Sequence, residues 1–214
     1  MKDTIKVFLA DDHAMVREAL AALIARNEDI DVVGQCGQAD KISEMVRKHS
    51  PNVVVLDIAM PGLNGLEVCR QLARKSKGPA ILILTMYDDE EVVATALRYG
   101  AGGYLLKEAA SEQLTEAIRA VAAGDLYLGG GIPRTVLEHM HSAESDPYER
   151  LSARERQVLQ MIAEGKTNRE VAEQLSIAVK TVDTHRSHLM NKLDIHDQTT
   201  LVKYALRKGI VPLD

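Results

Sequence analysis

The chain has 214 residues, of which 46% are apolar, and its formal net charge is −5. This length fits one large domain or two small ones, and the apolar content excludes a chain that is disordered throughout. The apolar runs are far shorter than the roughly 20 residues of a membrane helix, and the first residues lead into a strand instead of a signal peptide. We therefore expect a soluble, cytoplasmic protein that has no contact with the membrane.

The charges are distributed unequally between the two ends of the chain. Residues 1–147 carry 15 Lys and Arg against 22 Asp and Glu, a net charge of −7, whereas residues 148–214 carry 11 against 9, a net charge of +2. One Phe and no Trp leave little aromatic surface for stacking on single-stranded nucleic acid. Binding to duplex DNA is not affected by that shortage, and the two ends are expected to perform different tasks.

The amino-terminal half alternates apolar, strand-like runs with segments of helical period. The five runs occupy residues 5–10, 31–36, 53–56, 80–85 and 103–106, and a last helical segment covers residues 111–123. This alternation predicts βαβ units and a parallel sheet. In such sheets, ligands bind at the carboxyl ends of the strands, so a functional site is expected there.

After residue 124 the pattern changes. A Gly-rich piece, a short helical stretch around residues 134–141 and a polar, Pro-containing piece follow one another. Every later segment has helical period, and start signals are found at Ser152, Thr167 and Asp197. We therefore predict three parts: residues 1–124, a linker at 125–147, and a small all-α domain of four helices at 148–214.

Chemically distinctive side chains stand where four of the predicted strands end. Asp11 and Asp12 follow the first run, Asp57 follows the third just before a turn at residues 60–62, Thr85 ends the fourth, and Lys107 follows the fifth. Three clustered carboxylates repel one another unless a cation is present, and Mg²⁺ is the natural ion for such oxygen ligands. The sequence lacks the Gly-rich loop of nucleotide-binding proteins, so a carboxylate that accepts a phosphoryl group is the remaining interpretation.

This set, with MPGLNG shortly after Asp57, resembles the receiver domain of two-component response regulators over roughly residues 4–123. The resemblance implies a flavodoxin-like, five-stranded parallel sheet in the order 2-1-3-4-5. It also implies that Asp57 accepts a phosphoryl group from a sensor histidine kinase, with Thr85 and Lys107 contacting the phosphoryl oxygens. The implied Mg²⁺ ligands are Asp11, Asp12, Asp57 and the backbone carbonyl of Ala59, and the implied switch residues are Thr85 and Tyr104.

The carboxyl-terminal helices include a candidate helix-turn-helix. Within residues 179–193, Val182, Leu189 and Leu193 share one face, and short polar side chains share the opposite face. Residues 151–210 closely resemble the LuxR-type DNA-binding domain of the NarL/FixJ response regulators. The resemblance implies a recognition helix at 179–192 and a pairing helix at 199–208. The expected readers of bases are Asp183, Thr184 and Ser187, with His188 beside them, and the expected phosphate contacts are Lys180, Thr181, Arg186, Asn191 and Lys192.

Together these features predict a response regulator that binds promoter DNA as a homodimer after phosphorylation of Asp57. It is not expected to be an enzyme, apart from its own phosphoryl transfer and dephosphorylation. One alternative is a DNA-binding regulator that uses its receiver only to dimerise and is never phosphorylated. A second alternative is an aspartate-nucleophile phosphatase, which should carry a second acid near Asp57, where Ala59 stands.

Overall fold

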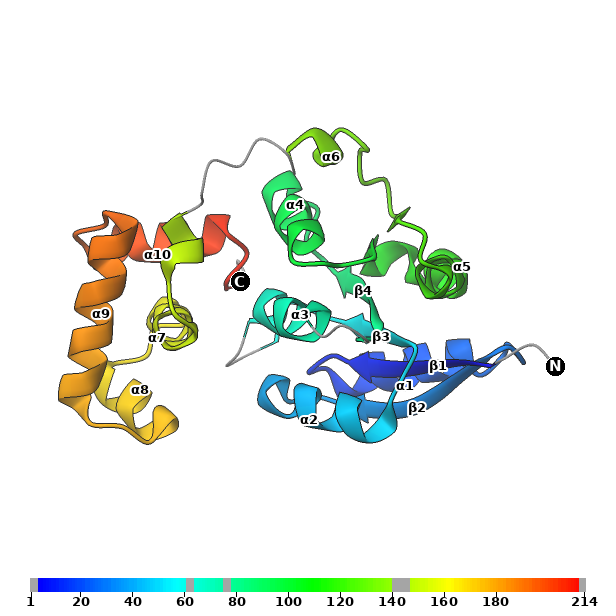
Figure 1. Cartoon of the computed structure of the whole chain (residues 1–214), viewed down its shortest axis with the longest axis horizontal. Coiled ribbons are helices and arrows are strands. Elements are labelled where there is room, and N and C mark those ends of the chain that lie inside the picture. Colours follow the sequence, from blue (N-terminus) through cyan, green and yellow to red (C-terminus); the bar gives the residue numbers. More distant parts are fainter. Residues whose placement is uncertain (1–3, 61–63, 75–77, 140–146, 212–214) are drawn as a thin grey trace. The chain divides into compact units, whose positions relative to one another are not determined.

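The computed structural model describes residues 4–60, 64–74, 78–139 and 147–211 of the chain. The chain divides into two compact units, Met1–His141 and Ser142–Asp214 (Figure 1). Each unit has hydrophobic core residues of its own. Every helix in the described ranges is too short or too polar to cross a lipid bilayer.

The first unit is a parallel six-stranded sheet with helices on both faces. The strands follow one another in the order β2-β1-β3-β4-β5-β6, and each neighbouring pair is parallel. The strands are β1 (Ile5–Ala10), β2 (Ile30–Cys36), β3 (Val53–Leu56), β4 (Ala80–Thr85), β5 (Gly103–Leu106) and β6 (Tyr127–Leu128). The helices are α1 (Ala14–Ile24), α2 (Ala39–His49), α3 (Gly65–Ala73), α4 (Glu90–Arg98), the 3-10 turn Lys107–Ala109, α5 (Ala110–Ala123) and α6 (Val136–His139). The predicted fold class is confirmed, with one short strand added.

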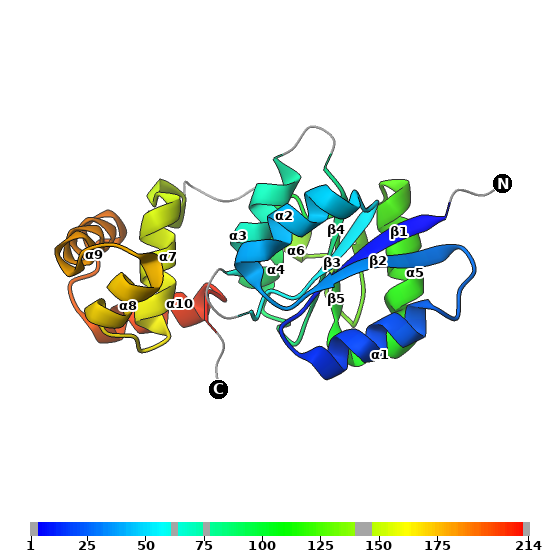
Figure 2. The ribbon, with the colours of Figure 1, turned by 90° about the horizontal axis from the view of Figure 1, so that it is seen from below.

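The sheet separates two apolar layers. Helices α1 and α5 cover one face, and α2, α3 and α4 cover the other (Figure 2). Strand β3 shows why the third run lacks polar residues: Val53 and Val55 face the first layer, whereas Val54 and Leu56 face the second. A central strand with both faces buried has no position for a polar side chain until it reaches the rim of the sheet.

The segment expected as a linker, residues 125–147, is partly folded onto the first unit. The backbone N–H groups of Tyr127 and Gly129 donate to the carbonyls of Gly102, just before β5, and Tyr104, within it, at 3.1 and 2.9 Å. These bonds supply partners to an otherwise unpaired sheet edge. Helix α6 follows, and its Val136 is completely buried. Residues 140–146 of the expected linker lie outside the described residues. The first part of that segment therefore extends the sheet, and the domain limits stay a prediction.

The second unit consists of short helices. They are the 3-10 turn Pro147–Arg150, α7 (Ala153–Ala163), α8 (Asn168–Leu175), α9 (Val179–Leu193) and α10 (Gln198–Arg207). The predicted capping boxes are present at Ser152 and Thr167, and the side chain of Asp197 caps α10. Helix α9 begins after Ala178 with no side-chain cap. The four predicted helices are thus confirmed, and their apolar faces form one core.

Candidate functional site

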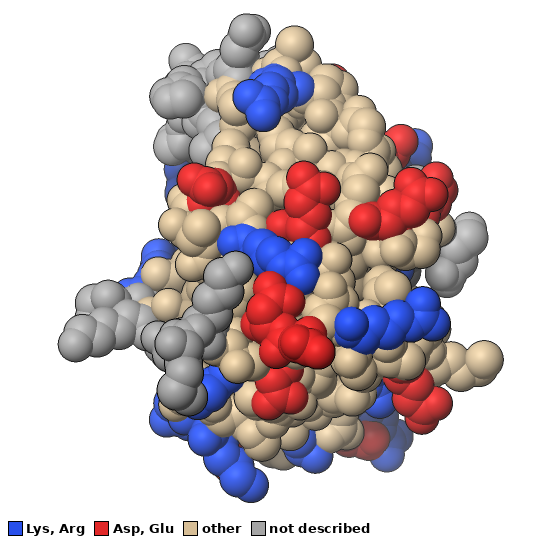
Figure 3. Space-filling view, turned by 90° about the vertical axis from the view of Figure 1, so that its right-hand side faces the viewer, with Lys and Arg blue, Asp and Glu red and all other residues tan. Residues whose placement is uncertain are grey.

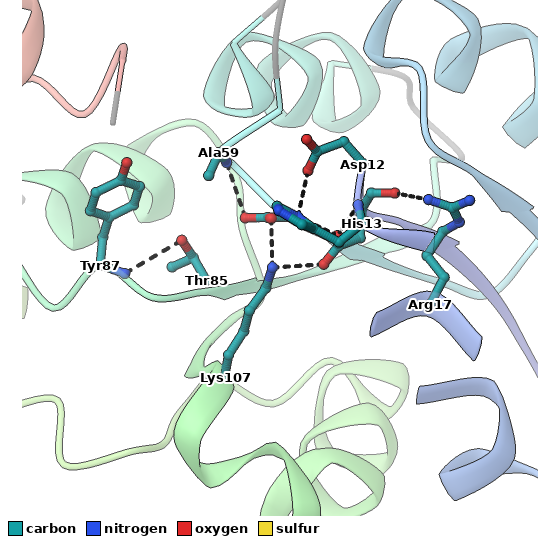
Figure 4. A network of polar contacts seen from close by, with 9 residues as sticks. Asp12, His13, Arg17, Ala59, Thr85, Tyr87 and Lys107 are labelled. Carbon is teal, nitrogen blue, oxygen red and sulfur yellow. Dashed lines mark hydrogen bonds and ion pairs between the residues drawn. The ribbon is translucent and has the colours of Figure 1, made fainter. Parts of the chain in front are cut away.

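The carboxyl ends of β1, β3 and β5 bring acidic and basic side chains to one rim of the sheet, as the chain order predicts (Figure 4). Lys107 Nζ lies 2.7 Å from Asp57 Oδ2 and 2.7 Å from Asp11 Oδ2. Asp12 stands beside Asp11 on the same loop, and carboxylate oxygens of all three Asp residues lie within 4.8 Å of one another. The predicted acidic cluster therefore exists, and one ammonium group joins two of its members.

Asp57 is the most deeply placed of these carboxylates, with 1% of its surface exposed. Its Oδ1 accepts the backbone N–H of Ala59 at 3.0 Å, and its Oδ2 accepts from Lys107. Burial raises the pKa of Asp57 above its usual value, although Lys107 and the Ala59 N–H act in the opposite direction. The turn after Asp57 was expected at residues 60–62, of which 61 and 62 lie outside the described residues.

Lys107 remains charged between its two acidic partners. Burial acts to lower its pKa, but Asp57 and Asp11 outweigh that effect, so the pKa lies above its usual value. One ammonium group leaves two of the three carboxylate charges uncompensated, and the cluster is rich in oxygen. A hard divalent cation such as Mg²⁺ fits this donor set in both charge and chemistry.

Two polar residues beside the cluster were not anticipated from the sequence. His13 places Nδ1 2.9 Å from Asp12 Oδ1, and its backbone N–H donates to Asp11 Oδ1 at 2.8 Å. Arg17 of α1 donates from Nη1 to the backbone carbonyl of Asp11 at 2.5 Å. The only signal in the sequence was their nearness to the acidic pair, since His13 follows Asp12 directly and Arg17 comes four residues later. Both residues fix the loop that carries Asp11 and Asp12.

Thr85 and Tyr104 are connected through Tyr87. Thr85 is completely buried, and its Oγ1 accepts the backbone N–H of Tyr87 at 3.5 Å. Tyr104 is also completely buried, and its hydroxyl donates to the carbonyl of Tyr87 at 2.9 Å. Burial, together with nearby carboxylates that include Asp57, holds the pKa of Tyr104 well above its usual value. The phenol is therefore neutral and tethers the loop that begins at Thr85.

The second unit presents the predicted polar face on α9. Val182, Leu189 and Leu193 are buried, as the helical period predicts. The opposite side is open to solvent, and its exposed members are Lys180, Thr181, Asp183, Thr184, Ser187, His188, Asn191 and Lys192. Arg186 is half-buried. The face is thus free to meet a ligand, except where individual side chains already have partners.

Two of the expected phosphate-contacting side chains are held within the unit. Lys192 Nζ lies 2.7 Å from Oε2 of the buried Glu155. Arg186 donates to Asn168 at 3.3 Å and to Gln198 at 3.1 Å. Sequence reasoning missed these partners because they lie on other helices. Lys192 and Arg186 are therefore less available for phosphate than the exposed Lys180.

The excess of acidic residues does not produce a uniform surface. On the face shown in Figure 3, acidic and basic side chains lie among one another on a largely uncharged background. An electrostatic field of one sign is therefore not a feature of that face. The acidic rim differs in kind, because its carboxylates are gathered at one point.

Comparison with known proteins finds a matching family model in each of the two units. The family model "Response regulator receiver domain" matches residues 7–119, and the model "Bacterial regulatory proteins, luxR family" matches residues 149–205. The chain is 39% identical over 215 residues to the oxygen regulatory protein NreC of Staphylococcus haemolyticus, with 97% of this chain and 99% of NreC covered. Both matches agree with the resemblance given by the sequence motifs.

Solved structures of response regulators align with nearly the whole chain. The response regulator ChrA of a heme-sensing two-component system is 35% identical and has a TM-score of 0.52, with 97% of this chain and 99% of ChrA covered. RcsB of Salmonella enterica serovar Typhimurium, solved bound to a promoter in the presence of phosphomimetic BeF3⁻, is 25% identical with a TM-score of 0.62. That comparison covers 95% of this chain and 99% of RcsB.

Proposed function

Because the chain belongs to the response regulators that join a receiver domain to a LuxR-type DNA-binding domain, we propose that it is switched by phosphorylation of Asp57. The proposed donor is a sensor histidine kinase, and the proposed output is binding of a homodimer to double-stranded promoter DNA. The observation that carries this proposal is the position of the Lys107 ammonium group, 2.7 Å from both Asp57 and Asp11 at the rim of the sheet.

In the proposed reaction, a carboxylate oxygen of Asp57 attacks the phosphorus of the phosphohistidine. The new O–P bond forms as the P–N bond breaks, and the imidazole leaves with the electron pair. Lys107 moves its ammonium group from Asp57 toward the phosphoryl oxygens, whose charge it offsets. Mg²⁺, when bound by Asp11, Asp12, Asp57 and the carbonyl of Ala59, supplies further neutralisation of those oxygens.

The proposed switch uses the contacts around Tyr87. Phosphorylation places new acceptor oxygens at the rim, and the Thr85 hydroxyl can turn toward them. Thr85 would then lose its hydrogen bond from the backbone N–H of Tyr87, whose carbonyl also accepts a hydrogen bond from Tyr104. A phosphoryl group can shift the receiver only if it binds one arrangement of this loop better than the other, and Thr85 with Lys107 supplies that difference.

The proposed DNA contacts lie on α9. Its exposed face enters the major groove, where Asp183, Thr184 and Ser187 meet base edges and Lys180 meets phosphate. The net charge of +2 for residues 148–214 is modest, so two copies on paired half-sites are needed for firm binding. Such a role places the protein in the cytoplasm with the chromosome.

The test is the intact mass of the full chain after incubation with acetyl phosphate and Mg²⁺. We expect one added phosphoryl group in the wild type and none in an Asp57→Asn control. Removal of Mg²⁺ by EDTA should suppress the gain, because the carboxylates then lack their divalent partner. If no gain occurs under conditions in which a known receiver is labelled, the regulator that never becomes phosphorylated is the better account. Hydrolysis of a chromogenic phosphate ester would instead support a phosphatase.

A further inference from the structure

Two side chains of α9 are hydrogen-bonded to the first residues of the neighbouring helices α8 and α10. Asn168, the first residue of α8, donates from Nδ2 to Asp183 Oδ1 at 2.5 Å. Its own Oδ1 accepts from Arg186 at 3.3 Å, and Arg186 also donates to Gln198, the first residue of α10, at 3.1 Å. We call these four residues, Asn168, Asp183, Arg186 and Gln198, the Asn168 relay.

The backbone of Asn168 is held independently of α9. Thr167 caps α8, its Oγ1 accepts the backbone N–H of Glu170, and Glu170 returns a carboxylate to the backbone N–H of Thr167 at 2.7 Å. The two hydrogen bonds of this capping box restrain the first turn of α8. The amide of Asn168 is therefore presented to α9 from a fixed position.

Asp183 benefits most from a fixed partner because it is exposed. An exposed carboxylate samples several rotamers in water, and ordering it on binding costs conformational entropy. Asn168 occupies Oδ1 of Asp183, whereas Oδ2 has no partner among the described residues. The carboxylate is thus oriented before DNA arrives, with one oxygen still able to accept a hydrogen bond.

The chemistry of Asp183 limits what it can read. A carboxylate can only accept hydrogen bonds, and the exocyclic amino group of cytosine is the donor that Asp and Glu meet in the major groove. Away from such a donor, its negative charge opposes binding to the phosphate backbone. An orientation that is wrong by one rotamer would therefore convert a specific contact into a repulsive one.

We propose that Asn168 determines specificity by orienting Asp183 toward a cytosine amino group. Arg186, which is itself held by Gln198, fixes the oxygen side of the Asn168 amide. This inference rests on the proposed docking of α9 in the major groove. Asn168 acts as a positioning residue, because its effect on base choice passes through Asp183. The same relay ties the reading face to the start of α10.

The experiment selects bound sequences from a random-sequence duplex library, using the full chain with and without acetyl phosphate and Mg²⁺. Wild type, Asn168→Ala, Asp183→Ala and the double variant are compared. Affinity for the selected duplex, and for the same duplex changed at the cytosine, is then measured across salt concentrations. Gln174→Ala is the matched control, because Gln174 is an exposed amide of α8 whose partner is Lys166, outside the relay.

The inference expects both single variants to lose preference at the same base pair of each half-site, by about tenfold. The double variant should lose no more than either single one, since the two residues act as one unit. The slope of affinity against salt should stay unchanged for Asn168→Ala, because neither a charge nor a phosphate contact is removed. Gln174→Ala should behave as the wild type.

Three results would overturn the inference. Asn168→Ala could weaken binding to all duplexes equally with a shallower salt slope, which would assign it to phosphate. Asn168→Ala could leave base preference intact while Asp183→Ala relaxes that preference, which would show that Asp183 does not need Asn168 to orient it. Asp183→Ala could leave base preference unchanged, which would show that Asp183 does not read a base.

The docking of α9 is judged separately by Lys180→Ala, which should weaken binding at every sequence. A chain that selects no duplex would refute both proposals.

Discussion

The Nζ atom of Lys107 lies 2.7 Å from Oδ2 of Asp57, and it reaches Oδ2 of Asp11 at the same distance. The ammonium group therefore occupies the place where the two carboxylates would otherwise repel each other. One ammonium group compensates only one of these two negative charges, and Asp12 adds a third carboxylate to the cluster. The remaining negative charge is what a divalent cation would offset, and the effect of such an ion on stability can be measured.

The first prediction concerns the buried charge of Asp57. Its folded-state pKa is raised by burial, so the folded protein keeps this proton to higher pH than the unfolded chain does. The ionised carboxylate therefore destabilises the fold progressively as pH rises above the unfolded value of 3.8 and through the folded pKa. Without Mg²⁺, Asp57→Asn should raise the free energy of unfolding at pH 7 by about 1 kcal/mol, because the buried charge is removed while Lys107 keeps Asp11 as its partner.

Urea unfolding of both proteins between pH 4 and pH 8, without Mg²⁺, measures this effect. The difference between the two proteins should shrink toward the acid end of the range, where Asp57 becomes protonated. Added Mg²⁺ should stabilise the wild type more than the variant. A variant that is less stable than the wild type at pH 7 would contradict the assigned direction.

A second prediction concerns the close approach of α3 to the acceptor. A Cβ atom on Gly65 would lie 2.5 Å from both the Asp57 carbonyl oxygen and the Ile58 Cα, and these backbone atoms cannot move without displacing Asp57. Gly65→Ala should cost about 2 kcal/mol of unfolding free energy and slow phosphorylation by acetyl phosphate. Gly102→Ala is the control, since its nearest neighbours lie at 3.7 Å. Equal behaviour of the two variants would refute the prediction.

The third prediction separates two lysines of α9 that the sequence treats alike. Lys192 is paired with Glu155, whose pKa is held below its usual value because hydrogen bonds from Lys192 and Ser152 outweigh burial. Lys192→Met should therefore lower the free energy of unfolding at pH 7 by about 1 kcal/mol, with little effect on the salt slope of DNA binding. Lys180→Ala should reduce that slope by about one and leave stability unchanged.

Chemical unfolding and DNA titrations at several salt concentrations distinguish the two lysines. The stabilisation by Glu155 should be present above its unfolded pKa of 4.5 and be lost as pH falls through the lower folded pKa. The difference between wild type and Lys192→Met should therefore vanish in acid. If Lys192→Met instead leaves stability intact and flattens the salt slope, Lys192 is a phosphate contact, as the sequence alone suggested.

A fourth prediction concerns the lifetime of the phosphoryl group. Ala59 has no polar side chain to orient an attacking water, and a bulky residue, Tyr87, stands two positions after Thr85. The phosphorylated form should therefore persist for minutes or longer, and Ala59→Asn should shorten its life. Loss of the mass gain is followed after removal of acetyl phosphate. A wild-type lifetime of seconds would show that these two residues do not protect the phosphoryl group.

The acidic rim could be predicted from sequence because strand direction alone decides it. Once Asp57, Asp11 and Lys107 are assigned to the ends of parallel strands, they must meet at one edge. The helices of the second unit could be predicted equally well, since capping boxes mark where α7 and α8 begin. These features depend on short stretches of chain and on general rules of topology.

Other features depend on which side chains the folded helices bring together. Strand β6 has two residues and is followed by glycines, so its sequence indicates a loop, and only the open edge of β5 makes it a strand. The pairing of Lys192 with Glu155 joins residues 37 positions apart, and Asn168 meets Asp183 across two helices. Periodicity places such residues on a face, but it does not identify their partners.

The most direct test of the whole account compares the DNA affinity of the phosphorylated and unphosphorylated full chain. A duplex chosen by selection is titrated with wild type and with Asp57→Asn, each with and without acetyl phosphate and Mg²⁺, while intact mass reports the phosphorylated fraction. We predict about tenfold tighter, cooperative binding for the phosphorylated wild type and no change for Asp57→Asn. Equal affinity of fully phosphorylated and unphosphorylated wild type would contradict the account.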